Sequence, residues 1–141
     1  MVSYTGTNQR KKKGWGMPIA KLSFFKVFVR DLPSAQSFYE RSLGFVQEGY
    51  FDTPDFLESV MRQPETDVSM MLLAYKDGRD ISAAIKHGPT GFFTDDIEAA
   101  HDKLVAEGAT AKGGIIVVGE GIKIALLDDP EGHEIELCQM P

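Results

Sequence analysis

A duplicated pattern of one strand, one helix and three strands most constrains the fold of this chain of 141 residues. In the first half, residues 22–30 alternate as a strand does, and Asp31-Leu32-Pro33 begins a helix that ends at Gly44. In the second half, Phe92-Phe93-Thr94 predicts a short strand and Asp95-Asp96 caps a second helix of nearly equal length. Two such units in one chain indicate an internal repeat.

The remaining strands complete both units. Residues 45–51, 68–75, 115–118 and 122–127 read as strands, and the run at 68–75 is apolar on both faces, which predicts a central position in its sheet. Residues 56–62 fit either a strand or a helical turn. We therefore predict an α+β fold in one domain at residues 17–141, with module one at 20–78, a linker at 79–90 and module two at 91–141.

Charge is distributed unevenly along the chain. Residues 1–16 contribute +4 through Arg10 and the lysines at 11–13, and the formal net charge is −6, which leaves −10 on residues 17–141. An acidic domain argues against nucleic acid as a partner. We expect the leader at 1–16 to be disordered, with a small nucleic-acid or membrane arm as the alternative.

Other classes are disfavoured by the composition. No apolar run approaches the roughly 18 residues of a membrane span, so we expect no membrane association through a helix. The single cysteine, Cys138, rules out an internal disulfide and is compatible with a cytoplasmic protein.

The first predicted strand has two different faces. Phe25, Val27 and Val29 form an apolar face that predicts core beneath a helix. Phe24, Lys26, Phe28 and Arg30 form the other face. Their mixture of aromatic rings and cations suits a partly wet cleft, whereas at a sheet edge the two cations would only extend to solvent.

The last predicted strand carries a candidate functional acid, Glu136. After the turn at residues 128–133, Ile135 and Leu137 point to one face, and Glu134, Glu136 and Cys138 point to the other. From the alternation alone, Glu136 is a metal ligand, a general base or a solvated side chain.

These motifs resemble those of the vicinal oxygen chelate superfamily, which includes glyoxalase I, extradiol dioxygenases and the bleomycin-resistance binding proteins. The residues that carry the likeness are Val29-Arg30-Asp31-Leu32, Phe38-Tyr39, Leu43-Gly44-Phe45, Asp129-Pro130-Glu131-Gly132 and Ile135-Glu136-Leu137. The resemblance implies two β-α-β-β-β modules whose sheets form cups around a cleft, in a homodimer.

The resemblance also implies four metal-ligand positions, at Phe24, Leu72, Pro89 and Glu136. Only Glu136 among them has a side chain that binds metal, and His87, two residues before Pro89, is a candidate replacement. We therefore expect no metal in the usual position and no cofactor. A divalent metal held by non-standard ligands stays open as an alternative.

The cleft implied by this fold is apolar and aromatic. Its expected ligand-binding residues are Phe24, Lys26, Phe28, Met70, Leu72 and Phe93. That lining favours a protein that binds a small aromatic or cationic molecule without a metal. The alternative is a lyase or isomerase in which Glu136 is the catalytic residue that moves a proton, with Lys26 or Arg30 stabilising the developing anion.

Overall fold

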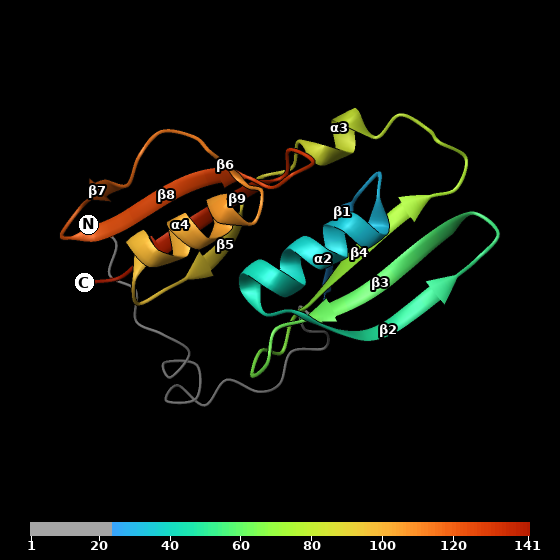
Figure 1. The fold of residues 1–141 in the computed structure, drawn as a ribbon, viewed down its shortest axis with the longest axis horizontal. Helices are drawn as coiled ribbons and strands as arrows, with labels where there is room; N and C mark the ends of the chain where they lie inside the picture. The colour runs from blue at the N-terminus through green and yellow to red at the C-terminus, as the bar shows by residue number, and fades with distance from the viewer. Residues whose placement is uncertain (1–23) are drawn as a thin grey trace, which may run out of the picture.

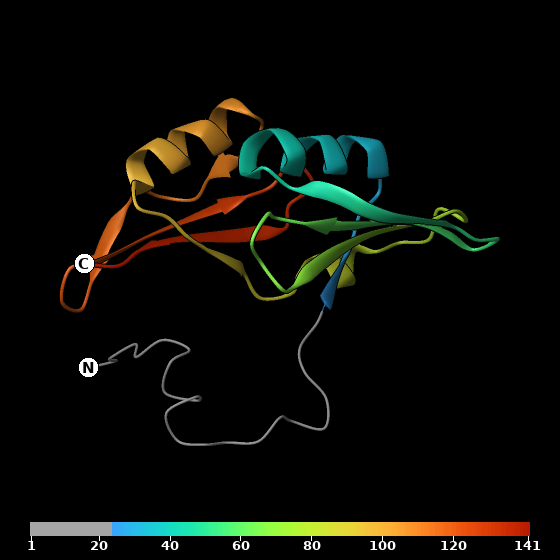
Figure 2. The same cartoon turned by 90° about the horizontal axis from the view of Figure 1, so that it is seen from below.

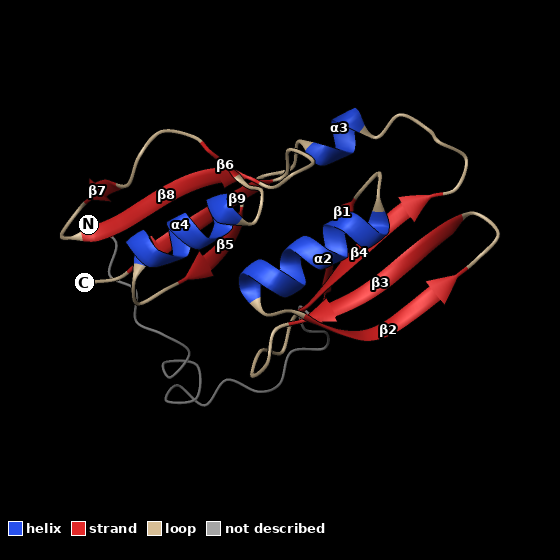
Figure 3. Ribbon diagram, viewed as in Figure 1, coloured by secondary structure: helices blue, strands red, loops and turns tan. Residues whose placement is uncertain are grey.

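The computed structural model of the protein describes residues 24–141, which form two mixed β-sheets and three helices (Figure 3). The first sheet has the strand order β1-β4-β3-β2. Its strands are β1 (Phe24–Phe28), β2 (Val46–Asp52), β3 (Phe56–Arg62) and β4 (Ser69–Tyr75). Strand β1 runs parallel to β4, and the other neighbours are antiparallel. The central position predicted for residues 68–75 is therefore confirmed.

The second sheet repeats this arrangement in the order β5-β9-β8-β6, and β7 also pairs with β8. Its strands are β5 (Thr90–Phe93), β6 (Thr110–Ala111), β7 (Ile116–Val118), β8 (Ile122–Asp128) and β9 (Glu134–Gln139). Strand β5 is parallel to β9, as β1 is to β4. The predicted α+β fold with two similar modules is confirmed.

Residues next to helix α2 (Leu32–Leu43) determine where it begins and ends. The side chain of Asp31 accepts a hydrogen bond from the Ser34 amide at 3.1 Å, and Pro33 lies in the first turn. Gly44 ends the helix in the left-handed conformation with φ of 69°. Leu32, Ala35, Phe38 and Tyr39 are buried beneath the helix. Helix α4 (Ile97–Ala106) is capped in the same way by Asp96.

Both long helices, α2 and α4, lie on the same side of the two sheets, and neither covers the opposite side (Figure 2). We call these opposite sides the open faces. Side chains on the helix side fill the core, for example Val27, Leu72 and Leu137, each at most 1% exposed. The modules lie side by side with α2 beside α4 (Figure 1). None of the helices in residues 24–141 is long and apolar enough to cross a membrane.

The turn before β9 fastens the second module to the first through Tyr39, Asp129, Glu131 and His133, which we call the closing-turn clamp. His133 is 1% exposed, and its Nδ1 lies 2.7 Å from Asp129 Oδ2 while its Nε2 lies 2.6 Å from the Phe28 carbonyl oxygen. A carboxylate and a carbonyl only accept hydrogen bonds, so both ring nitrogens donate and the imidazole is cationic.

The other members of the clamp are also hydrogen-bonded. The Tyr39 hydroxyl donates to Asp129 Oδ2 at 2.8 Å, and the Glu131 carboxylate accepts from the Arg30 and Asp31 amides at 2.6 and 3.0 Å. Burial alone would lower the pKa of His133, but the hydrogen bond and charge of Asp129 together with the Phe28 carbonyl raise it. Burial alone would raise the pKa of Asp129, but its bonds and charge interaction with His133 lower it.

The structure decides one alternative that the sequence leaves open and contains two short elements that the sequence does not predict. Residues 56–62 form a strand, because they pair with both β2 and β4. The predicted linker contains a short helix, α3 (Ser82–Ile85), and β6 pairs with β8 over only two residues. Both are too short for a periodic pattern to reveal. The predicted leader at 1–16 and the start of the strand predicted at 22–30 lie outside the described residues.

Candidate functional site

The open face of the first sheet presents the β1 residues predicted to line a cleft. Phe24, Lys26 and Phe28 alternate with the core residues of β1, and they lie beside Ser69, Met71 and Leu73 of β4. The Phe28 ring stacks on Tyr75 at 5.7 Å between centroids with 10° between the planes. This face is therefore an aromatic and aliphatic surface, with Lys26 in its midst.

Glu58 of β3 is the counter-charge of Lys26, and the sequence analysis missed it. The Lys26 ammonium lies 3.0 Å from Glu58 Oε2, and Glu58 is buried although it stands on the open face. In an alternating strand at 56–62, Glu58 would share a face with Phe56 and Val60. This alternation is the sequence signal that could have indicated Glu58. It does not show that Glu58 lies beside Lys26, because that depends on the pairing of β3 with β4.

The open face of the second sheet presents Glu136. Its neighbours across the sheet are Gly91 of β5 and Leu126 of β8. In the next row Cys138 lies between Phe93 and Ile124. Burial, and then the charge of Glu136, raise the pKa of the Cys138 thiol, which keeps it protonated and unreactive. Glu136 therefore stands in a largely apolar surface.

The predicted ligand-binding set is divided between different places. Phe24, Lys26 and Phe28 lie on one open face and Phe93 on the other, whereas Met70 and Leu72 point to the helix side of β4. Leu72 is fully buried, so it cannot contact a ligand on an open face. Because β4 is apolar on both faces, its sequence did not show which residues face the helix.

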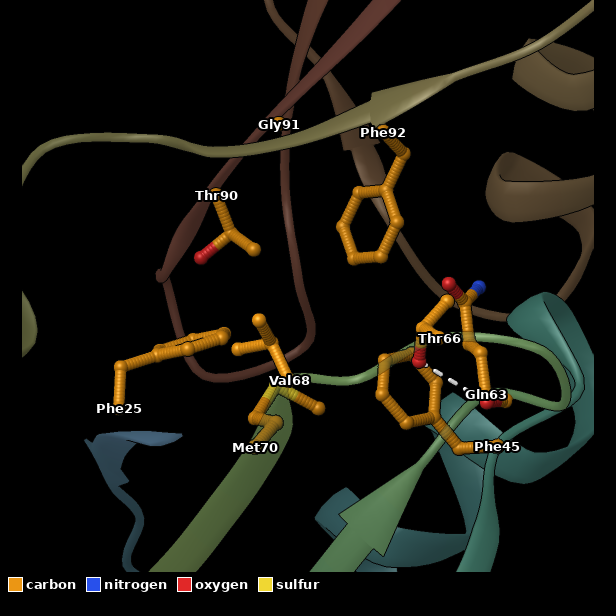
Figure 4. Close-up of a pocket in the computed structure, with 9 residues that line it drawn as sticks. All are labelled: Phe25, Phe45, Gln63, Thr66, Val68, Met70, Thr90, Gly91 and Phe92. Atoms are coloured by element: carbon orange, nitrogen blue, oxygen red, sulfur yellow. Dashed lines mark hydrogen bonds between the residues drawn. The ribbon is translucent and has the colours of Figure 1, made fainter. Parts of the chain in front are cut away.

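Met70 instead lines a crevice between the modules, with a volume of about 190 Å³ (Figure 4). Its lining residues are Phe25, Phe45, Gln63, Thr66, Val68, Met70, Thr90, Gly91 and Phe92. The rings of Phe45 and Phe92 meet edge to face, with centroids 6.2 Å apart. This crevice lies on the core side of β1, because it contains Phe25 and excludes Lys26.

The side chains around Glu136 do not fit a metal site in one protomer. Gly91 and Leu126, its neighbours across the sheet, offer no side-chain donor, and no group of three or more metal-binding side chains occurs within residues 24–141. His87 lies after α3, with its ring 5.9 Å from that of His133. It therefore adjoins the closing-turn clamp.

Comparisons with known proteins agree with this architecture. Residues 21–137 match the family model of the glyoxalase/bleomycin resistance protein/dioxygenase superfamily. Comparison with curated protein sequences gives no match.

Among solved structures, a member of that superfamily from Sphaerobacter thermophilus is 26% identical with a TM-score of 0.68, and the match covers 86% of this chain and 98% of that one. TnmS3, an antibiotic-binding protein from Streptomyces sp. CB03234, is 24% identical with a TM-score of 0.69, covering 89% and 100%. Glyoxalase I from Zea mays is 18% identical with a TM-score of 0.70, and this chain spans 44% of its length.

Proposed function

Because this chain belongs to the glyoxalase/bleomycin resistance protein/dioxygenase superfamily, we propose that it binds a small aromatic or cationic molecule in a cleft built from its two open faces. The observation that carries the proposal is the chemistry of these faces. Large apolar side chains stand exposed on both, including Phe24, Phe93 and Ile116. A surface of this kind, with a few charged groups set into it, suits a planar ligand held by stacking.

A second copy of the chain completes the cleft. The two open faces lie beside each other in one protomer rather than opposite each other (Figure 2). A homodimer in which the first sheet of one protomer faces the second sheet of its partner would enclose a ligand between them. The likeness to TnmS3, an antibiotic-binding protein, supports binding as the function.

Strand β7 offers a test with a matched control. Ile116 is 53% exposed and pairs with Ile124 on the open face, whereas Val117 is 64% exposed and pairs with Lys123 on the helix side. We expect Ile116→Lys to weaken both dimerisation and ligand binding, because it places a charge in an apolar interface, and Val117→Lys to change neither.

Analytical ultracentrifugation and a thermal-shift screen of aromatic and cationic compounds measure the two properties. A wild-type protein that is monomeric at high concentration would refute the shared cleft. So would equal behaviour of the two lysine variants.

Binding in this proposal needs no metal. The resemblance to the superfamily implies four metal-ligand positions, and Glu136 is the residue among them whose side chain can bind a metal. Its neighbours across the sheet, Gly91 and Leu126, offer no further side-chain donors. Metal analysis of protein purified without chelator, with thermal shifts in nickel, zinc, manganese and iron, tests this directly. A stoichiometric ion whose binding is lost in Glu136→Gln would overturn the metal-free proposal.

The second candidate is a lyase or isomerase that uses Glu136 as a general base. The observation that favours it is the position of this carboxylate between Gly91 and Leu126, on a face where a bound carbonyl compound would lie against it. Glu136→Gln should then abolish turnover of a substrate while leaving its binding intact. Turnover that persists in this variant would exclude Glu136 as the base.

A further inference from the structure

The ion pair of Lys26 and Glu58 is an unusual feature of the first open face. The Glu58 side chain is 7% exposed, whereas Lys26 is 39% exposed, and their charged atoms are 3.0 Å apart. Burying a carboxylate is costly unless a cation accompanies it. Lys26 therefore covers Glu58, and the lysine is the member of the pair that a ligand on this face can reach.

The lysine has hydrogen-bonding capacity to spare. Glu58 Oε2 is enclosed and forms no hydrogen bond of acceptable geometry with any described residue, although the Lys26 ammonium is close. An ammonium group has three donors and no acceptor. One carboxylate oxygen engages one of these donors, and the Lys26 side chain is 39% exposed, so the remaining donors can reach an oxygen that approaches from the open side.

Aromatic residues precede and follow Lys26 on this face of β1. Phe24 and Phe28 flank Lys26 along β1 on the same face, and Tyr75 extends the surface by stacking on Phe28. A ring system that lies on this surface would bring a substituent at its edge to Lys26. A hydrogen bond between charged partners in such an apolar setting is shorter and stronger than a neutral one.

We propose that Lys26 is a specificity residue that selects aromatic molecules carrying an ionised oxygen, such as a carboxylate, sulfonate or phenolate. This inference rests on the proposed binding function and narrows its ligand class from aromatic or cationic compounds to aromatic acids. Glu58 is a positioning residue: it holds the lysine on an apolar face, and its negative charge moderates the affinity for the acid.

Two fluorescent probes with the same ring system test the proposal. Anilinonaphthalene sulfonate carries an acidic group, and its parent N-phenylnaphthylamine has none. We expect the sulfonate to bind the wild-type dimer at least about tenfold more tightly than the parent, the magnitude of one charge-assisted hydrogen bond. Lys26→Met should remove this preference, and Lys26→Arg should restore it.

Three further variants complete the design. Since Lys26→Met leaves Glu58 buried without a counter-charge, the double variant Lys26→Met/Glu58→Leu removes the whole pair and protects the fold. Lys123→Met is the matched control, because Lys123 is 38% exposed and is paired with Glu98, yet it lies on the helix side of β8. Glu58→Gln should tighten binding of the sulfonate severalfold and leave the parent unchanged.

The outcomes separate the two proposals. Stoichiometric binding of both probes with equal affinity overturns the role of Lys26 and leaves the binding function standing. A preference for the sulfonate that survives in both Lys26→Met and Lys26→Met/Glu58→Leu does the same. A loss of preference in Lys123→Met also overturns it, because the effect would then be general surface charge. If neither probe binds the wild type, the binding function fails together with the inference.

Discussion

Replacing His133 by leucine tests the closing-turn clamp most directly. The substitution removes the cation that faces Asp129, whose side chain is 2% exposed, and leaves the Phe28 carbonyl without its donor. Removing one partner of a buried ion pair costs about 3–5 kcal/mol of unfolding free energy. Asp129 keeps its hydrogen bonds from the Tyr39 hydroxyl and from the backbone N–H groups of Glu131 and His133. We therefore expect a loss of about 3 kcal/mol of unfolding free energy, at the lower end of that range.

The assay is urea unfolding followed by circular dichroism at pH 6, with Arg41→Leu as the control. Arg41 also joins the modules, through an ion pair with Glu107 at 2.8 Å, but this pair is partly exposed. Its loss should cost less than about 1 kcal/mol. A loss below about 1 kcal/mol for His133→Leu as well would refute the reasoning that His133 is a charged member of the clamp.

The pH dependence gives a second readout of the same clamp. The pKa of His133 is raised in the folded state, so its contribution is complete below the unfolded pKa, about 6.5, and is lost as the pH rises through the folded pKa. The pKa of Asp129 is lowered, so its contribution is lost as the pH falls through that lower value. The stability advantage of the wild type over His133→Leu should therefore shrink on the alkaline side, and an advantage that grows there would contradict a raised pKa.

Three further substitutions have expected effects on stability, each measurable by urea unfolding. Gly44→Ala should cost about 1 kcal/mol of unfolding free energy. The cost is conformational alone, because φ is 69° and the added Cβ meets no atom within 4 Å. An unchanged unfolding free energy would contradict the left-handed helix cap. Leu72→Ala should cost about 2–5 kcal/mol of unfolding free energy, because Leu72 lies in the core. The folded variant should keep its affinity for both fluorescent probes. A loss of probe affinity in folded protein would place Leu72 at the ligand. Glu131→Gln should cost about 1–3 kcal/mol of unfolding free energy, because the Arg30 and Asp31 amides donate to different oxygens of Glu131 and glutamine has only one oxygen to accept them. An unchanged unfolding midpoint would exclude Glu131 from the clamp.

Helix boundaries and the faces of β1 were predictable because local residues determine them. Asp31 caps α2 and Gly44 ends it through contacts within a few residues, and Val27 is buried while Lys26 faces out, as the alternation in β1 requires. The clamp residues were recognisable as a turn motif. Their bonds to Tyr39 and Phe28 were not, since these partners lie about 90 and 105 residues away in the sequence.

The candidate site was only partly predictable, because its geometry depends on pairing between strands. The sequence placed Lys26 on a mixed face, but the partnership with Glu58 follows from the position of β4 between β1 and β3. The assignment of Leu72 to a cleft did not anticipate its burial, because a strand that is apolar on both faces carries no directional signal. How the two sheets lie relative to each other is likewise a tertiary property.

The closing-turn clamp also determines when the protein can finish folding during synthesis. Glu131 accepts a hydrogen bond from the Arg30 amide, 101 residues earlier in the chain, so the corner between β1 and α2 forms before its partner has been synthesised. Until then the Phe28 carbonyl and the Tyr39 hydroxyl lack their native partners. The first module therefore emerges with an incomplete corner, and translation must pass the closing turn before the clamp can join the two modules.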